Sequence, residues 1–126
     1  MNKKQVIIAV IFLLLAIALG ALGAHGLKSL ISAKKIASFE VGVRYQIYIG
    51  LLLLILGFNN DKFQFSIKWI SSLLIAGAIL FSGSIYLLSF EELTTINLKF
   101  LGPITPLGGS LMIVGLGIFV YKLVKR

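Results

Sequence analysis

Three ionisable residues lie where the chain could bring charge into an apolar segment. His25 is the only histidine, and Glu40 and Arg44 stand four residues apart at the start of a later apolar run. This spacing puts two side chains on one face of a helix, where a carboxylate and a guanidinium can pair. If the two helices are neighbours, His25 could reach Glu40 and exchange a proton with it. Such groups indicate function when they lie inside a membrane, but near a helix end they also serve as anchors to the head groups.

Other kinds of chemistry have little support in these residues. A metal site needs several ligands, and the chain has a single histidine and no cysteine. The sequence contains no nucleophile paired with a base, no phosphate-binding glycine loop and no pair of carboxylates at catalytic spacing. We therefore expect no enzyme activity, no catalytic residue, no cofactor and no metal.

Composition indicates that most of this chain is dissolved in lipid. Of its 126 residues, 59% are hydrophobic and only 13% are charged, whereas a soluble domain carries about 25% charged residues. A net charge of +8 would suggest nucleic-acid binding in a soluble protein. Here the basic residues lie between apolar runs and at the termini, where they contact lipid head groups and set topology. We expect membrane lipids as partners and no nucleic acid.

Four apolar runs are long enough, or nearly so, to cross a bilayer as helices. A helix rises about 1.5 Å per residue, so roughly 20 apolar residues span the hydrocarbon core. Because the backbone must satisfy its own hydrogen bonds in lipid, these runs predict helices, and the alternation typical of barrel strands is missing. The predicted fold is all-α, an integral membrane four-helix bundle that forms one domain over residues 1–126. The predicted spans are about residues 6–24, 41–58, 69–90 and 104–122.

Two segments allow a second interpretation. The first, M-N-K-K-Q with the apolar run that follows, resembles a secretory signal peptide. The run is longer than a usual signal core, so we expect an uncleaved helix. The second is the connection over residues 27–39, whose apolar residues recur at near-helical spacing. It is either a short amphipathic helix on the membrane surface or a solvated loop.

The fourth span has a recognisable start. Thr105 can cap the free N–H groups of a helix, and Pro106 suits the first helical position, where the missing N–H has no partner to lose. The sequence therefore predicts a helix that begins at this pair.

The distribution of basic residues predicts the orientation. With four spans, both termini and the middle loop lie on one side of the membrane. That side carries seven lysine or arginine residues and the other carries five. The positive-inside rule then places both termini in the cytoplasm.

Small residues recur on every predicted span. Helices in lipid associate by close packing, and small side chains let their backbones approach. These faces can build the bundle, join copies in a homo-oligomer or receive another membrane protein, and the sequence leaves these uses open. The predicted helix-packing positions are Ala16, Gly20, Gly23, Ala24, Gly83, Pro106, Gly108 and Gly109.

A few polar residues lie within or beside the spans. Ser82, Ser84 and Tyr86 could line a polar spot in the third span, although serines in membrane helices more often bond a neighbouring backbone group. These residues have either a functional or a structural role. The candidate polar positions are His25, Glu40, Arg44, Tyr45, Gln46, Ser82, Ser84 and Tyr86.

Four stretches read together resemble one family. They are G-A-L-G-A-H-G-L-K, F-E-V-G-V-R-Y-Q-I-Y, L-F-S-G-S-I-Y-L-L and I-T-P-L-G-G, in this order over nearly the whole chain. The pattern is similar to the YwdK-like small four-span bacterial membrane proteins, an uncharacterised family with eukaryotic relatives. The resemblance implies a multi-pass plasma-membrane protein without an assigned activity. The motif positions are Gly23, Ala24, His25, Gly26, Leu27, Glu40, Arg44, Tyr45, Gln46, Phe81, Ser82, Gly83, Ser84, Tyr86, Pro106, Gly108 and Gly109.

One position departs from the family pattern. Members similar to this chain often carry a histidine just after the Y-Q-x-Y stretch, where this chain has Ile49. The departure argues against a metal site or proton relay shared with His25. It favours a structural role for the motifs, with G-A-H-G as a packed helix exit.

Three functions stay open. A structural or accessory membrane protein, acting on lipid organisation or on a membrane partner, fits the small-residue faces and the scarcity of buried charge. A small transporter or channel is the alternative. It would be an oligomer because four short helices enclose little space. Its motivation is the Glu40–Arg44 pair, the glycine-rich helices and the break at Pro103 and Pro106 near the fourth span. An enzyme acting on lipid has the least support.

Overall fold

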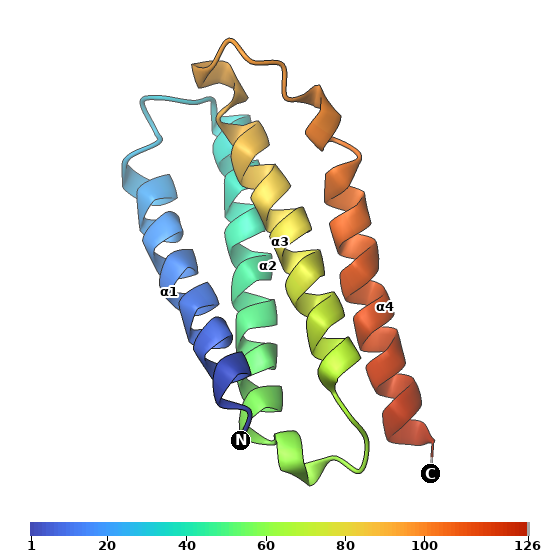
Figure 1. The fold of residues 1–126 in the computed structure, drawn as a ribbon. Coiled ribbons are helices and arrows are strands. Elements are labelled where there is room, and N and C mark those ends of the chain that lie inside the picture. The colour runs from blue at the N-terminus through green and yellow to red at the C-terminus, as the bar shows by residue number, and fades with distance from the viewer. Residues whose placement is uncertain (126) are drawn as a thin grey trace.

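The computed structural model describes residues 1–125, and within them it has four long helices and no strand (Figure 1). All four are long and apolar enough to cross a membrane, which confirms the all-α membrane fold. The span limits themselves stay predictions. The long helices are α1 (Lys3–His25), α2 (Ala33–Phe58), α3 (Lys68–Ser89) and α4 (Ile104–Val124), with the short 3-10 helices η1 (Asn60–Lys62), η2 (Glu91–Leu93) and η3 (Lys99–Leu101) between them.

The long helices pack in the order of the chain. Extensive contacts join α1 to α2, α2 to α3 and α3 to α4. Consecutive helices run in opposite directions, so the N-terminus and the C-terminal end lie at the same end of the molecule (Figure 1). As a result α2 and α3 each have two long neighbours, while α1 and α4 have one.

Helix α2 begins well before the predicted second span. Ser32 is its N-cap, and the Ser32 hydroxyl accepts a hydrogen bond of 3.3 Å from the Lys35 backbone N–H. The preceding connection is a run of turns in which Leu27 and Ile31 are buried. Phe39, two turns into α2, is also fully buried. The separate surface helix is not formed, because these apolar residues pack into the protein.

Helix α4 begins at Ile104, with Pro103 as its N-cap residue. The prediction that Thr105 caps this helix is wrong. The Thr105 hydroxyl instead shares a hydrogen bond with the Ser84 hydroxyl on α3. Pro106 lies in the first turn of α4, where its missing N–H removes no helical hydrogen bond.

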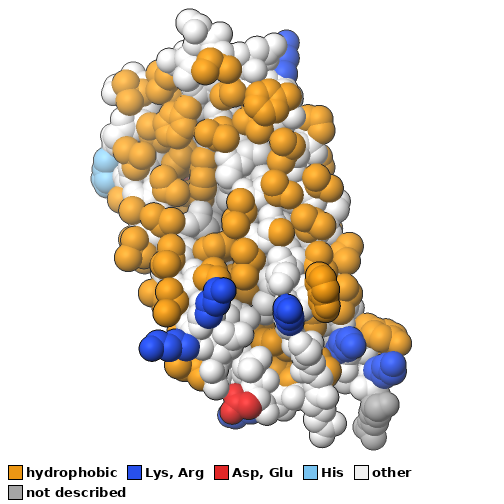
Figure 2. Space-filling view, in the orientation of Figure 1, with side chains coloured by type: hydrophobic (Ala, Val, Ile, Leu, Met, Phe, Trp, Pro, Cys, Tyr) orange, Lys and Arg blue, Asp and Glu red, His pale blue; other side chains and the backbone are white. Residues whose placement is uncertain are grey.

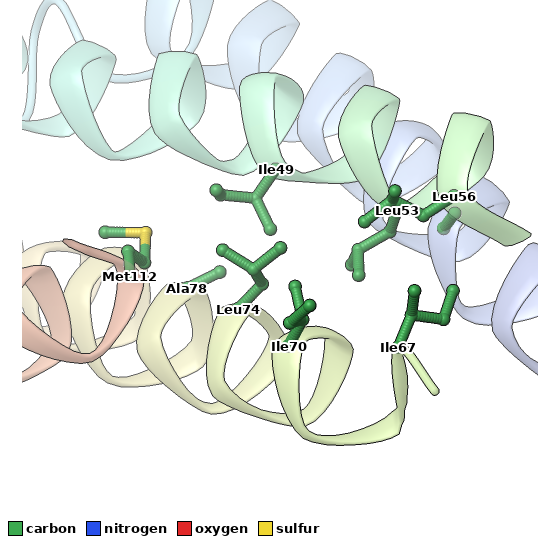
Figure 3. Packing of buried hydrophobic residues seen from close by; sticks show 9 residues of the cluster. Ile49, Leu53, Leu56, Ile67, Ile70, Leu74, Ala78 and Met112 are labelled. Atoms are coloured by element: carbon green, nitrogen blue, oxygen red, sulfur yellow. The ribbon is translucent and has the colours of Figure 1, made fainter. Parts of the chain in front are cut away.

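The larger apolar core lies between α2 and α3 (Figure 3). Its side chains recur every three or four residues along both helices, which places them on facing stripes. Ala9 adds a contribution from α1, and Met112 adds one from α4. The cluster consists of Ala9, Ile49, Leu53, Leu56, Ile67, Ile70, Leu74, Ala78 and Met112.

Helices α3 and α4 approach each other closely at two glycines. A Cβ added to Gly108 would lie 2.4 Å from the Phe81 backbone nitrogen, and one added to Gly77 would lie 2.7 Å from the Gly108 carbonyl oxygen. The two helices can meet at this depth only because both positions lack a side chain.

The other predicted packing positions differ in how closely they are covered. Ala16 is fully buried, and an added Cβ at Gly23 would lie 3.0 Å from the Phe39 ring. Gly83 has no neighbour within 4 Å of an added Cβ, and Ala24 is exposed. The looser contacts are those of Gly20 with Val43, at 3.5 Å, and of Gly109 with the Phe81 ring, at 3.6 Å.

Candidate functional site

The three ionisable candidate residues lie on the surface. His25 is the last residue of α1, and Glu40 and Arg44 are exposed on the first half of α2. Within residues 1–125 the one ion pair joins the Met1 amino group to Asp61. The predicted Glu40–Arg44 pair is therefore not formed, because two exposed charges gain little from being held together.

Gln46 occupies the centre of a polar network that joins three helices. Its side chain is buried on α2. The Gln46 Nε2 group donates a hydrogen bond of 2.7 Å to the Phe12 carbonyl oxygen on α1. The Gln46 Oε1 atom accepts a hydrogen bond of 2.6 Å from the Tyr86 hydroxyl on α3. One amide side chain thus connects α1, α2 and α3.

The Tyr86 ring reaches Gln46 across a glycine. A Cβ added to Gly42 would lie 2.8 Å from Cε1 of that ring, so a side chain at this position would displace it. The Gly42 carbonyl oxygen also accepts a hydrogen bond of 2.7 Å from the Ser82 hydroxyl. The Tyr86 ring also packs against an apolar side chain, because the centroid of the Phe39 ring lies 5.0 Å from the centroid of the Tyr86 ring.

Two further polar candidates lie outside this network. Ser84 is buried and connects α3 to α4 through the Thr105 hydroxyl. Tyr45 is exposed on α2, where its ring packs against Tyr48 and Phe81 with centroid distances of 5.5 and 4.9 Å. The structure thus brings together Gln46, Ser82 and Tyr86, and leaves Tyr45 apart.

Sequence reasoning missed two hydrogen bonds from polar side chains. Gln5 is buried, and its Nε2 group donates a hydrogen bond of 3.0 Å to the Leu53 carbonyl oxygen. The Lys35 ammonium group donates one of 3.2 Å to the Leu88 carbonyl oxygen at the opposite end. Both residues stand among charged or polar neighbours near helix starts, where a sequence gives no sign of inward orientation.

A small groove adjoins the network. It lies between α1, α2 and α3, has a volume of about 190 Å³, and is bordered by Gln46, Ser82, Gly83 and Tyr86 together with apolar side chains. Among residues 1–125 no three potential metal-ligating side chains come together. The polar groups here are donors and acceptors of interhelical hydrogen bonds, and their arrangement serves to hold helices in register.

Ile49 shows why a shared histidine site does not fit this fold. It is buried in the larger core, one residue before Gly50, which packs against Phe12 and Leu13 of α1. His25 lies twelve or more residues further along α1, which corresponds to roughly 18 Å along the helix axis. A group at position 49 and the His25 ring are too far apart to bind one metal ion.

The chain is similar to known proteins over most of its length. Residues 19–109 match the family described as protein of unknown function (DUF423). A UPF0382 membrane protein of Staphylococcus saprophyticus is 37% identical over 113 residues, which is 90% of this chain and 90% of that protein. The UPF0382 membrane protein YwdK of Bacillus subtilis is 39% identical over 125 residues, which is 98% of each chain.

No solved structure matches the chain. The family match covers more than half of the chain, and the relatives align over nearly all of it. These matches confirm the family that the four sequence stretches resemble. This chain belongs to the DUF423 family, whose relatives named here are UPF0382 membrane proteins.

Proposed function

We propose that this chain is a multi-pass protein of a bacterial plasma membrane with both termini in the cytoplasm. We further propose that it has a structural or accessory role and is not an enzyme. The location is supported by its bacterial relatives, which are named membrane proteins. The orientation is supported by the lysine side chains at the end that holds both termini (Figure 2). They belong to Lys3, Lys4, Lys62, Lys68, Lys122 and Lys125.

The observation that carries the accessory role is the exposure of the two outer helices. Each has a single long neighbour, so most of its apolar surface faces outward. Ile17 on α1 is 69% exposed, and Ile113 on α4 is 72% exposed. The buried polar groups, in contrast, are mostly used in hydrogen bonds between helices. Such a molecule offers lateral surface for association and little internal chemistry.

Labelling of single cysteines tests the orientation cleanly because the chain has no cysteine. Gln64, Ser29 and Thr95 are exposed and lie in connections between the long helices. In intact cells, a membrane-impermeant maleimide is expected to label Ser29→Cys and Thr95→Cys and to spare Gln64→Cys until the membrane is opened. The reverse pattern would place the termini outside.

A photoreactive residue at Ile17 or Ile113 tests the association. The matched control is Ile79, which is exposed on the inner helix α3. In native membranes we expect crosslinks to protein from at least one outer helix and only to lipid from Ile79. Crosslinks to lipid alone from all three positions would remove the support for lateral association.

A small transporter or channel is the second candidate. The observation in its favour is the groove beside Gln46, Ser82 and Tyr86. Gly83→Leu would fill this groove, because an added Cβ at Gly83 meets nothing within 4 Å. Solute flux in liposomes that persists unchanged in Gly83→Leu, Glu40→Gln and Arg44→Ala would count against this route.

A further inference from the structure

Three aromatic rings fix the α2–α3 connection against the end of α4. Phe63 and Phe65 lie in the connection, and Phe119 lies in the second half of α4. The Phe119 ring centroid is 5.7 Å from that of Phe63 and 6.4 Å from that of Phe65. All three side chains are half-buried. Segments more than fifty residues apart in the sequence are thereby held side by side.

A cleft opens where these segments meet, and we call it the basic cleft. Its volume is about 650 Å³, which lies within the roughly 300–1,000 Å³ typical of small-molecule sites. Lys62 and Gln64 approach it from the connection, and Lys122 and Lys125 approach it from α4 and the residue after that helix. The remaining lining residues are Phe63, Phe65 and Leu123.

The charge in the basic cleft is of one sign. No acidic residue lines it. The three ammonium groups are exposed, and none donates a hydrogen bond to another residue in the described part of the chain. Lys125 Nζ lies 5.6 Å from the centroid of the Tyr121 ring. Because Lys125 is also exposed, an anion can still reach its ammonium group.

Asp61, the acidic residue next to Lys62, already has a charged partner. One Asp61 carboxylate oxygen lies 3.2 Å from the Met1 amino group. A hydrogen bond from its own backbone N–H, and after that the Met1 amino group, lower the pKa of Asp61. Lys62 also lowers this pKa, but it contributes least among these groups, so Asp61 interacts mainly with its own backbone and the amino terminus.

The segments that line the basic cleft lie at the end of the molecule where the termini emerge (Figure 1). Trp69, near the start of α3, and Tyr121, near the end of α4, are exposed at this end of the molecule. Such rings prefer the boundary between hydrocarbon and water. The neighbouring surface of α4 is apolar, with Val120, Leu123 and Val124 exposed. A ligand with an anionic head and apolar tails matches both halves of this surface.

We propose that the basic cleft binds the phosphate head group of an anionic membrane phospholipid, with the acyl chains along the apolar face of α4. The proposal adds a lipid contact to the proposed accessory role and rests on the proposed assignment of this end to the cytoplasmic leaflet, which attracts basic clusters. Lys62, Lys122 and Lys125 supply the charge that recognises the head group.

Lipid competition in reconstituted vesicles tests the proposal. The cleft variant is Lys62→Gln with Lys122→Gln and Lys125→Gln. The control variant is Lys3→Gln with Lys4→Gln and Lys68→Gln, which removes the same charge from the same end outside the basic cleft. The measured quantity is the ratio of phosphatidylglycerol to phosphatidylcholine retained by each protein in native mass spectrometry after extraction from vesicles that contain both lipids.

The wild-type protein is expected to retain phosphatidylglycerol selectively. Lipids attracted only by the general surface charge are removed on extraction, whereas three lysines in direct contact with one head group contribute about fivefold each, so the cleft variant is expected to lose more than about tenfold in this ratio. The control variant is expected to lose much less. Equal losses in both variants would show that the lysines of this end, including Lys4 and Lys68 beside a second cleft, retain the lipid without preference for the basic cleft. An unchanged ratio in the cleft variant would show no site. Either result overturns the proposal.

Two further measurements separate the remaining explanations. Inorganic phosphate that displaces phosphatidylglycerol at equal concentration would identify a site for a soluble anion and overturn the lipid assignment. Maleimide labelling of Gln64→Cys in cells reports orientation alone. A reversed orientation would contradict the proposed function. The lipid ratio is measured on the purified protein, so it would still show whether the basic cleft binds the lipid. Thermal unfolding of each variant confirms that it is folded.

Discussion

The Tyr86 hydroxyl donates a hydrogen bond of 2.6 Å to the side-chain oxygen of Gln46, across the interface between α3 and α2. Gln46 also donates a hydrogen bond to the Phe12 carbonyl oxygen on α1. Both residues come from stretches that the sequence analysis singled out, and their neighbours Gly42 and Ser82 meet at the same interface. These four residues of the motif stretches therefore meet in the packing of α2 against α3.

Ser82→Ala is expected to destabilise the protein by about 0.6 kcal/mol, and by at most about 1.7 kcal/mol, the range measured for interhelical hydrogen bonds in membranes. The change removes the bond to the Gly42 carbonyl oxygen. The matched control is Ser72→Ala, since the exposed Ser72 hydroxyl bonds only its own helix. Thermal unfolding in detergent measures both, and equal effects would contradict an interhelical role for Ser82.

Gly108→Ala is expected to cost roughly 1–3 kcal/mol, as overpacking of a tight contact does. The added methyl group would meet the Phe81 backbone at 2.4 Å and force α4 away from α3. Gly117→Ala on the same helix meets nothing within 4 Å, so alanine there is expected to be neutral or stabilising. The unfolding midpoint of Gly108→Ala should therefore be lower than that of Gly117→Ala. Similar midpoints would contradict the close contact of α3 and α4.

His25→Gln and Arg44→Gln are expected to change stability by less than about 0.5 kcal/mol, as is usual for exposed positions. Both side chains are exposed, and neither takes part in an ion pair within residues 1–125. Any cellular phenotype that the family confers should also survive His25→Gln. A large loss in either measurement would restore His25 or Arg44 as a functional group.

The ion pair between Asp61 and the Met1 amino group predicts a pH dependence. A hydrogen bond from its own backbone N–H, and after that the Met1 amino group, hold the folded-state pKa of Asp61 below its ordinary value of 3.8. These interactions stabilise the protein above that value and lose their effect as pH falls through the folded pKa. Melting temperatures of wild type and Asp61→Asn should differ slightly at neutral pH and converge in acid. A difference that is unchanged at low pH would show that the carboxylate charge is not responsible.

The sequence was sufficient to predict the number and type of the long helices. The reason is physical, because a backbone in lipid must bond to itself and apolar runs of this length leave only helices. The start of α2 was harder to predict. Lys34, Lys35 and Glu40 lower the hydropathy of its first turns, yet Ser32 caps the helix and Phe39 buries its inner face. A helix can extend beyond the apolar segment that reveals it.

The candidate site was predicted only as a set of residue types. That Gln46 meets Tyr86 depends on how α2 and α3 are rotated about their axes, and spacing along one helix does not determine rotation against another. The spacing of Glu40 and Arg44 correctly places them on one helix face, but their exposed side chains do not pair. The hydrogen bond from Gln5 to the Leu53 carbonyl oxygen likewise depends on how α1 and α2 are rotated about their axes.

The most direct test of the structural role of the motifs is a double-mutant cycle on Gln46 and Tyr86. The variants are Gln46→Met, Tyr86→Phe and the two combined, with unfolding free energies measured in one detergent or bilayer system. We predict that Tyr86→Phe costs about 0.6–1.7 kcal/mol in the wild-type protein and almost nothing beside Gln46→Met, which gives a coupling of the same size. Strictly additive effects, or a Tyr86→Phe variant as stable as wild type, would contradict a motif that holds the helices together.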